Sequence, residues 1–501
     1  ASSATAITYD TLAPTVTLTR TGSGTLKSGQ TDTITFTLSE AATDFAVGDI
    51  TVSGGTLSSF TATSSTVYSV VFTPTTNTQS GTGSISVAGA KFTDAAGNNN
   101  TASTVLSISY DTAAPTVTIT RAGSVLRTGI TEQITFTLSE ASSTFAAEDI
   151  TVAGGSIGGL TTTSSTVYYV QFTPTTNTQS GTGSISVAGA TFTDAAGNSN
   201  TASSATAITY DTLAPTVTVS RSYSLPIGVR QNNTITFTLS EASNTFAVND
   251  ITVTGGSIGS LTTVSSTVYR VLFTPTADTA SGTATLSVDG AKFTDAAGND
   301  NTASNTLSIP FDTREPTVAI TRAGSTSLRS GQTDIITFTL SEASNTFIAS
   351  DITVTGGSIG ALTTTSSTVY SVVFTPATNT QSGTGSISVA AGRFTDATGN
   401  GNIASSTRSV PYDTLAATIS NVNSSTANGT LGIGSSVSIQ ITFTEAVTVS
   451  GMPQLTLETG ATDRTASYAS GSGTSSLTFT YTVQSGDTSG DLDYASTSAL
   501  A

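Results

Sequence analysis

The sequence predicts an all-β chain made of tandem β-sandwich domains, and three observations support this prediction. First, 501 residues at about 100–150 residues per domain correspond to roughly three to five domains. Second, one phrase returns about every 100 residues along the chain, which indicates internal duplication. Third, apolar residues alternate with Thr, Ser or small residues in short segments, and no window shows the 3.6-residue apolar spacing of a helix.

The repeated phrase reads Y-D-T-L-A-P-T-V in the first copy and returns four times with small changes. The five copies begin at Tyr9, Tyr110, Tyr210, Phe311 and Tyr412. Three other phrases recur in phase with it: T-F-T-L-S-E-A, D-I and F-T-D-A-A-G-N. The spacing from Glu40 to Asp49, and from Asp49 to Asp94, is the same in all four copies that carry these phrases. Length varies only between the linker Asp and the Glu.

Seven strands are expected in each copy. In the first copy, five segments alternate apolar with Thr, Ser or small residues, at 15–20, 31–40, 66–74, 81–89 and 103–110. Two further strands are expected from Asp49 onward and near 56–62, and Gly, Pro and Asn separate the strands. Seven short strands in about 100 residues is the strand count of an immunoglobulin-like sandwich. We therefore expect tandem immunoglobulin-like β-sandwich domains.

The linker Asp residues divide the chain into six parts. Residues 1–16 are identical to 202–217, so 1–9 is interpreted as the last strand of a preceding repeat. Four repeats follow, at 10–110, 111–210, 211–311 and 312–412. Residues 413–501 form a divergent, incomplete sandwich that lacks the F-T-D-A-A-G-N phrase and a closing strand. The chain is expected to be a window in a longer repetitive protein, and short linkers that contain Pro predict an extended rod.

Composition excludes most catalytic chemistry. The chain has no Cys, no His and no Trp, which rules out disulfides, Cys/His zinc sites, haem ligation, thiol nucleophiles and Ser–His–Asp machinery. Carboxylates, hydroxyls, amides and carbonyls remain, and these are ligands of hard cations. The net charge of −17 disfavours nucleic acid and anionic lipid as partners, and no apolar run is long enough to span a membrane. We predict that the chain is not an enzyme.

The combined phrases D-T-x-A-P, L-S-E-A, F-x-x-x-D-I and F-T-D-A-A-G-N resemble the bacterial immunoglobulin-like repeats of large secreted adhesins and surface proteins. The resemblance covers residues 10–412 almost without interruption. It implies a tandem extracellular array, often rigidified by calcium, between a cell anchor and a distal binding region. The unit that starts at Asp413 resembles a different sandwich repeat found in the same kind of protein.

Strand direction places the acidic residues at one end of each domain. If strand 15–20 runs away from the linker residue Asp10, the next strand returns and ends with Glu40 at the N-terminal pole. Asp49 begins an outward strand at that pole, and three more strands bring the loop with Asp94 and Asn98 back to it. Carboxylates crowded at one pole repel each other, and Lys and Arg are scarce. Ca²⁺ accepts 6–8 oxygen ligands in irregular geometry and would neutralise them.

The predicted calcium ligands are the equivalent residues of every copy. They are Asp10, Glu40, Asp49, Asp94 and Asn98; Asp111, Glu140, Asp149, Asp194 and Asn198; Asp211, Glu241, Asp250, Asp295 and Asn299; Asp312, Glu342, Asp351, Asp396 and Asn400; and Asp413 with Glu445.

Each acidic residue also has an interpretation without a metal. Glu40 would be a solvated strand end, Asp10 a linker residue, and Asp94 an Asx-turn residue that caps its own loop. Paired carboxylates also occur in glycoside hydrolases, but four identical catalytic pairs at domain junctions are improbable. Disorder is disfavoured by the regular apolar alternation, and the Thr-x-Thr pattern of an ice-binding face arises on any exposed strand.

The predicted function is a structural stalk segment of a bacterial extracellular adhesin or cell-surface repeat protein, rigidified by calcium at the domain junctions. Its partners are neighbouring repeats of the same chain. The alternative is a self-assembling filament or surface-layer subunit, in which other copies join by lateral packing or strand exchange. A carbohydrate-binding array would need exposed aromatic platforms, whereas the Phe residues fall at core positions.

Overall fold

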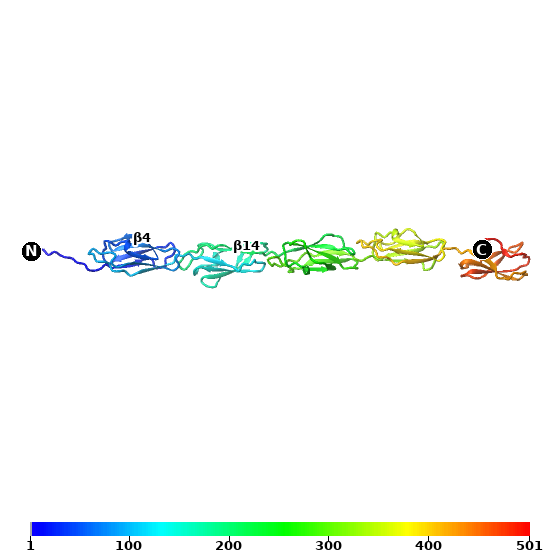
Figure 1. Ribbon diagram of the computed structural model, residues 1–501, viewed down its shortest axis with the longest axis horizontal. Helices are drawn as coiled ribbons and strands as arrows, with labels where there is room; N and C mark the ends of the chain where they lie inside the picture. The colour runs from blue at the N-terminus through cyan, green and yellow to red at the C-terminus, as the bar shows by residue number, and fades with distance from the viewer. Residues whose placement is uncertain (1–2) are drawn as a thin grey trace. The chain divides into compact units, whose positions relative to one another are not determined.

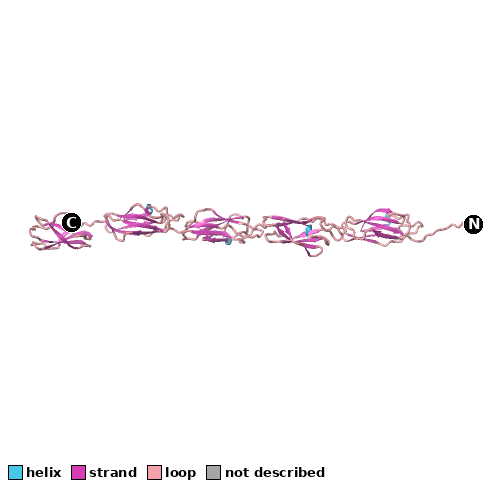
Figure 2. Ribbon diagram, turned by 180° about the vertical axis from the view of Figure 1, so that it is seen from behind, coloured by secondary structure: helices cyan, strands magenta, loops and turns pink. Residues whose placement is uncertain are grey.

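The computed structural model describes residues 3–501, and regular structure in this part of the chain is almost entirely β (Figure 1, Figure 2). The helical elements are four single turns of 3-10 helix: Val47–Asp49, Ala147–Asp149, Val248–Asp250 and Ala349–Asp351. The chain divides into two compact units, and the boundary between them runs through the third repeat. The first unit extends to Tyr223 and includes Asn233–Phe273 and Thr285–Ser308, and the second contains the remaining residues up to Ala501.

Strands recur in the same order in all four repeats. The first has β1 (Val16–Arg20), β2 (Asp32–Leu38), β3 (Ile50–Ser53), β4 (Gly55–Ala62), β5 (Val67–Pro74), β6 (Gly81–Val87) and β7 (Leu106–Tyr110). The second has β8 (Val117–Thr120), β9 (Glu132–Leu138), β10 (Ile150–Ala153), β11 (Gly155–Ile157), β12 (Thr161–Thr162), β13 (Val167–Pro174), β14 (Gly181–Val187) and β15 (Thr206–Tyr210).

The third repeat has β16 (Val217–Arg221), β17 (Asn233–Leu239), β18 (Ile251–Thr254), β19 (Gly256–Ile258), β20 (Thr262–Thr263), β21 (Val268–Pro275), β22 (Gly282–Val288) and β23 (Leu307–Phe311). The fourth has β24 (Val318–Arg322), β25 (Leu328–Arg329), β26 (Asp334–Leu340), β27 (Ile352–Thr355), β28 (Gly357–Ile359), β29 (Thr363–Thr364), β30 (Val369–Pro376), β31 (Gly383–Val389) and β32 (Arg408–Asp413).

Two antiparallel sheets form the first repeat. One sheet has the order β1-β2-β5-β4 and the other has the order β3-β6-β7. With the seven strands lettered A to G in chain order, these are the A-B-E-D and C-F-G sheets of a constant-type immunoglobulin sandwich. Gly54, with φ +72°, lies between β3 and β4 and redirects the chain from one sheet to the other. The predicted immunoglobulin-like sandwich is confirmed.

A parallel contact joins the two sheets at the C-terminal pole. Leu26, in the loop after β1, forms a parallel bridge with Tyr110 at the end of β7. The Leu26 N–H donates to the Ser109 carbonyl at 3.0 Å, and the Asp111 N–H donates to the Leu26 carbonyl at 2.8 Å. The second repeat makes the same bridge between Leu126 and Tyr210. The last strand of each repeat is therefore paired on both edges near the point where it leaves for the next linker.

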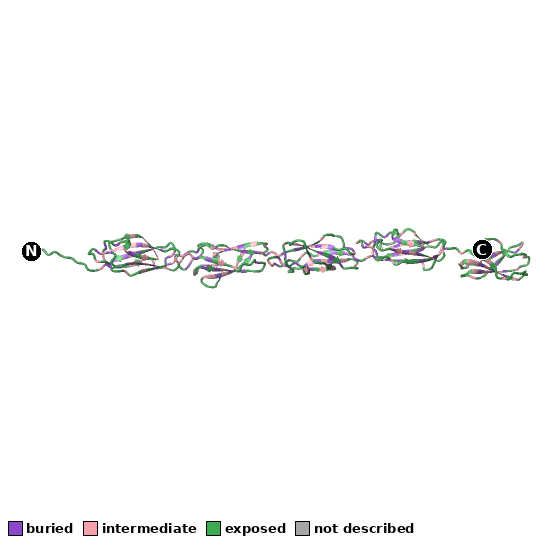
Figure 3. Cartoon of the chain, viewed as in Figure 1, coloured by how far each residue is buried: buried purple, intermediate pink, exposed green. Residues whose placement is uncertain are grey.

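Aromatic rings fill the space between the sheets. Figure 3 marks the buried residues in purple along the strands. In the first repeat Phe36, Phe72 and Phe92 are fully buried, at alternating strand or loop positions. Phe45 packs against Phe36, Tyr68 and Phe92, with ring centroids 4.9–5.7 Å apart. Rings in edge-to-face contact bury more area than aliphatic side chains, so they supply a core to a domain that has no cysteine.

The fifth domain differs from the four repeats. Its strands are β33 (Ile419–Ser424), β34 (Ser436–Val447), β35 (Gln454–Glu458), β36 (Arg464–Ser470), β37 (Thr474–Thr482) and β38 (Asp493–Tyr494). They form one sheet in the order β33-β34-β37-β36-β35-β38. The two sheets merge because β35 and β36 pair as a hairpin, whereas the corresponding strands of the repeats lie in separate sheets.

The N-terminal segment forms no strand in this chain. Residues 3–9 have no assigned strand, and Ile7 and Tyr9 are 85% and 88% exposed. Residues 206–210, which are identical in sequence to residues 5–9, form strand β15, in which Ile208 is fully buried. The sequence prediction for residues 1 and 2 lies outside the described residues.

Candidate metal centres at the repeat junctions

The linker Asp is held by its own turn at the start of each repeat. Asp10 Oδ1 accepts a hydrogen bond from the Leu12 N–H at 3.0 Å. Asp111 and Asp211 accept the equivalent bond from the residue two positions later, at 3.2 and 3.1 Å. This Asx turn uses one carboxylate oxygen and fixes the direction of the side chain.

The Asp of the F-T-D-A-A-G-N loop organises that loop. Asp194 Oδ1 accepts hydrogen bonds from the N–H groups of Gly197 and Asn198 at 2.7 and 2.8 Å. Its Oδ2 accepts a bond from the Asn198 side-chain amide at 2.7 Å. Asp194 is 6% exposed, so its charge is held almost out of water. The Asx-turn interpretation is thus correct for this loop, and it leaves open a second role for the carboxylate.

The Glu follows the second strand of each sandwich and meets both Asp residues at the N-terminal pole. One ligand atom from each of the three carboxylates lies within 4.8 Å of the others in all four repeats. The clusters are Asp10–Glu40–Asp94, Asp111–Glu140–Asp194, Asp211–Glu241–Asp295 and Asp312–Glu342–Asp396. The structure therefore brings together three of the four carboxylates that strand direction placed at this pole.

The fourth predicted carboxylate, Asp49, caps a helical turn. Asp49 ends the short 3-10 turn, and its Oδ2 accepts a hydrogen bond from the Ala46 N–H at 2.9 Å. Asp149, Asp250 and Asp351 cap the equivalent turns at 2.7–2.8 Å. None of these residues belongs to the three-carboxylate groups found among the described residues. Asp49 directly precedes β3, the first strand of the second sheet, β3-β6-β7.

One oxygen of the Glu is left without a hydrogen-bond donor. The Oε1 atoms of Glu40, Glu241 and Glu342 are shielded from solvent and have no partner in the described structure. Burial, and next the charges of Asp211 and Asp295, raise the pKa of Glu241. The same two causes raise the pKa of Glu140 and Glu342 in their clusters. A shielded carboxylate beside two others is the electrostatic situation that a bound cation relieves.

In the first repeat, the pKa of the loop residue Asp94 is shifted in the opposite direction. Burial acts to raise the pKa of Asp94, but hydrogen bonds from Asn98 and from the loop N–H groups outweigh it and lower the pKa. In the first repeat, therefore, the protein stabilises Asp94 as an anion, whereas it disfavours the charged form of Glu40.

A Gln from the preceding repeat reaches the cluster, and sequence reasoning missed it. Gln79 Nε2 lies 3.3 Å from Glu140 Oε2, and Gln179 Nε2 lies 3.2 Å from Glu241 Oε2. The signal was the shared phrase T-T-N-T-Q-S-G, which becomes T-A-D-T-A-S-G in the third repeat. There Arg314 pairs with Asp278 at 3.2 Å, and its charge partly offsets the raised pKa of Glu342.

The fifth domain keeps half of the arrangement. Asp413 Oδ1 and Glu445 Oε1 are both shielded from solvent and without a partner in the described structure. The domain lacks the F-T-D-A-A-G-N loop, so it does not supply the third carboxylate.

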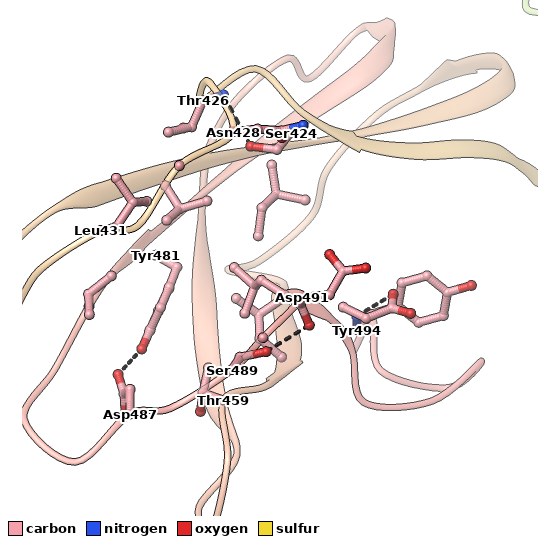
Figure 4. A pocket seen from close by; sticks show the side chains of 18 of the residues that line it. Ser424, Thr426, Asn428, Leu431, Thr459, Tyr481, Asp487, Ser489, Asp491 and Tyr494 are labelled. Atoms are coloured by element: carbon pink, nitrogen blue, oxygen red, sulfur yellow. Dashed lines mark hydrogen bonds between the residues drawn. The ribbon is translucent and has the colours of Figure 1, made fainter.

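A separate cavity of about 1010 Å³ opens in the fifth domain (Figure 4). It lies between β33 with the following segment 426–431 on one side and segment 487–494 on the other. Its lining includes the apolar side chains of Val437, Ile439 and Leu455 and the hydroxyl of Tyr481, which donates to Asp487. In the first repeat the last strand, β7, lies between β6 and the loop after the first strand, where Leu26 pairs with Tyr110.

Comparison with known proteins agrees with this architecture. A family profile described as "Bacterial Ig-like domain" matches residues 10–110, 111–210, 211–311 and 312–414. A search of curated protein sequences returns no match.

A search of solved structures returns matches that include the following three. Three tandem titin domains share 11% identity, cover 61% of this chain and 99% of theirs, and give a TM-score of 0.27. InvD of Yersinia pseudotuberculosis shares 16% identity with this chain. The match covers 75% of this chain and 85% of InvD, with a TM-score of 0.23. The S-layer protein rSbsC shares 14% identity with this chain. The match covers 97% of this chain and 67% of rSbsC, with a TM-score of 0.19. From the family match, which spans most of the sequence, the chain belongs to the bacterial Ig-like domain family.

Proposed function

We propose that this chain is a structural stalk segment of a bacterial extracellular or cell-surface protein, stiffened by Ca²⁺ at the junctions between repeats. Tandem domains of one family, linked by only a few residues, favour a spacing role over a catalytic one. Among residues 3–501, no helix is long and apolar enough to cross a lipid bilayer.

The observation that carries the calcium proposal is the unpartnered Glu241 Oε1 beside Asp211 and Asp295. The donor set is made of hard oxygen ligands, which suits Ca²⁺. Asp211, Glu241 and Asp295 would hold the ion, and Gln179 lies close enough to Glu241 to contribute its amide oxygen. The ion would supply the positive charge that offsets the three carboxylates of the cluster. This residue set therefore fits the ion.

Chelation tests the calcium proposal. Extracellular calcium modules bind at about 10⁻⁴–10⁻³ M, and one site adds about 1.4 kcal/mol of stability at a tenfold excess of free ion over Kd. We expect metal-free buffer to lower the melting temperature of the chain, and elemental analysis after equilibrium dialysis against excess calcium to find bound calcium. An unchanged melting curve together with absence of bound metal would refute it.

Small-angle scattering tests the stalk. Five domains of about 40 Å each, end to end, predict a maximum dimension of about 200 Å. A compact particle would contradict the proposal.

The second candidate function is a self-assembling filament, and one observation favours it. The cavity of the fifth domain opens beside the segment that follows its first strand, and in the repeats the equivalent loop pairs with the last strand. Residues 5–9 repeat the sequence of strand β15, and Ile7 and Tyr9 are exposed. Strand addition between copies would bury both surfaces. Sedimentation velocity at increasing concentration, with and without residues 1–9, distinguishes a head-to-tail polymer from a monomer.

A further inference from the structure

The Asn that ends the F-T-D-A-A-G-N loop forms a hydrogen bond to the preceding repeat. Asn198 Oδ1 accepts from the Ser28 N–H at 2.7 Å, and Asn299 Oδ1 accepts from the Thr128 N–H at 2.8 Å. Asn400 Oδ1 accepts from the Val229 N–H at 2.5 Å. We call this contact the amide bridge. It recurs at each of the three junctions between family repeats.

Every polar atom of the bridging side chain is used. Asn198 Nδ2 donates to Asp194 Oδ2 at 2.7 Å and to the linker carbonyl of Asp111 at 3.0 Å. Asn198, Asn299 and Asn400 are only 4%, 3% and 1% exposed, and a buried amide of this kind must satisfy all of its donors and acceptors. Because the Ser28 N–H can only donate, it fixes which side of the amide faces the preceding repeat.

The preceding repeat presents its N–H from a tight turn. The Gln30 N–H donates to the Lys27 carbonyl at 3.0 Å, and Gly29 has φ +76°, which matches a type II turn with Ser28 at its second position. Lys27 also crosses the junction, with Nζ 3.2 Å from the Gly197 carbonyl. Arg127 makes the equivalent contact with the Gly298 carbonyl at 2.5 Å.

We infer that the amide bridge sets the orientation of successive repeats, and that it does so whether or not a cation is bound. The Asn side chain joins three parts of the junction: the turn of one repeat, the linker, and the acidic loop of the next repeat. It was predicted from sequence as a metal ligand, but its oxygen is committed to the neighbouring repeat. The surface formed by the Ser28 turn therefore recognises a second domain of the same family that carries this Asn. The inference rests on the proposed role as a tandem array.

Removing the donor alone tests the bridge. Proline is favoured at the second position of a type II turn and has no N–H, so Ser28→Pro preserves the turn and deletes the bond. The chain has no cysteine, so Thr51→Cys and Thr151→Cys place one spin label on β3 and one on β10. Double electron–electron resonance on the full chain then gives the distribution of distances between the first two repeats.

We expect Ser28→Pro to broaden this distribution, with the population outside the native orientation rising about five- to tenfold, as for loss of one buried hydrogen bond. Asn198→Ala should broaden it in the same way. An unchanged distribution in both variants would overturn the inference.

Two matched controls come from the chain itself. Ser330→Pro changes the same kind of turn in the fourth repeat, where the Gln332 N–H donates to the Arg329 carbonyl and Gly331 has φ +80°. The domain that follows this turn is the fifth domain, which lacks the bridging Asn. Asn98→Ala alters the same loop in the first repeat. Neither variant should change the distance distribution between the labels, and broadening in either one would assign the effect to general loss of stability.

Repeating the measurement in metal-free buffer separates this inference from the calcium proposal. A narrow wild-type distribution without metal, broadened by Ser28→Pro, supports the bridge even if no calcium binds. A wild-type distribution that is already broad without metal, and that Ser28→Pro does not broaden further, would overturn the bridge while leaving the calcium proposal intact.

Discussion

Arg322 and Asp334 form a buried ion pair between strands β24 and β26 of the fourth repeat. Arg322 Nε donates to Asp334 Oδ2 at 2.7 Å, and each side chain is only 4% exposed. The Gly324 N–H donates to Asp334 Oδ1 at 2.9 Å, and Arg322 also donates to the Thr326 carbonyl at 2.7 Å. The pair therefore anchors the loop between β24 and β26. Arg20–Asp32 and Arg121–Glu132 repeat it in the first two domains.

Arg322→Ala should destabilise the fourth repeat by about 3–5 kcal/mol, because it leaves the Asp334 charge buried without its partner. Hydrogen exchange followed by mass spectrometry reports the stability of this repeat separately from the others. The exposed pair Arg314–Asp278 is the control: Asp278→Asn, which tolerates the left-handed φ of 51° at this position, should cost less than about 1 kcal/mol. Equal losses from the two variants would show that burial does not determine the contribution of the pair.

In the third repeat the acidic partner of this ion pair is replaced by Asn, so the pair can be restored by mutation. This repeat has Asn233 where the other repeats have an acid, and Asn233 Oδ1 is shielded from solvent with no partner in the described structure. Arg221 holds the sequence position of Arg20. We expect Asn233→Asp to stabilise the third repeat by about 1–2 kcal/mol, by adding a charge-assisted hydrogen bond. Slower hydrogen exchange in β16 and β17 would confirm this, and faster exchange would contradict it.

Glu241→Gln should remove one calcium ion from the chain, because Glu241 supplies the unpartnered oxygen of its cluster. Equilibrium dialysis followed by elemental analysis counts the bound ions. Asp250→Asn is the matched control, since Asp250 caps the 3-10 turn and lies outside the cluster. If both variants bind as many ions as the wild type, the proposed ligand set is wrong.

The metal-free chain should lose stability as pH rises above 4.5, the ordinary pKa of Glu. Burial and neighbouring charges raise the pKa of Glu140, Glu241 and Glu342 above the ordinary value of 4.5. The folded state then binds more protons than the unfolded state between the two pKa values, so stability is greatest at the acidic end and falls as these groups ionise. With calcium present the trend should reverse, because the ion requires the ionised form.

Denaturant titrations at several pH values, in metal-free buffer and in excess calcium, check both trends. Identical pH profiles in the two conditions would contradict the role of these Glu residues.

Much of the fold followed from local pattern. Alternation in segments such as 31–40 and 66–74 identified strands, and counting strand directions placed Glu40 and Asp94 at the same pole. Strand direction determines the end of the domain at which a residue lies, but it does not determine the sheet to which the residue belongs. Asp49 was therefore grouped with the cluster, whereas it starts the second sheet and caps a helical turn.

The junction contacts could not be predicted in the same way. Whether the oxygen of Asn198 faces an ion or the Ser28 N–H depends on how two domains meet, and spacing within one domain carries no information about this. The merged sheet of the fifth domain likewise depends on the hairpin between β35 and β36, which alternation alone does not reveal.

The parallel bridge between Leu26 and Tyr110 has a consequence for a chain under tension. The first strand of a repeat is pulled toward its N-terminal linker, and the last strand toward the C-terminal linker. The hydrogen bonds of Leu26 to Ser109 and Asp111 lie across this direction. A stretching force therefore loads them in shear, so that they must break together, whereas a peeled hairpin breaks its bonds one at a time. Each repeat is built to stay folded while force passes through it, and with no cysteine in the chain this resistance does not depend on redox conditions.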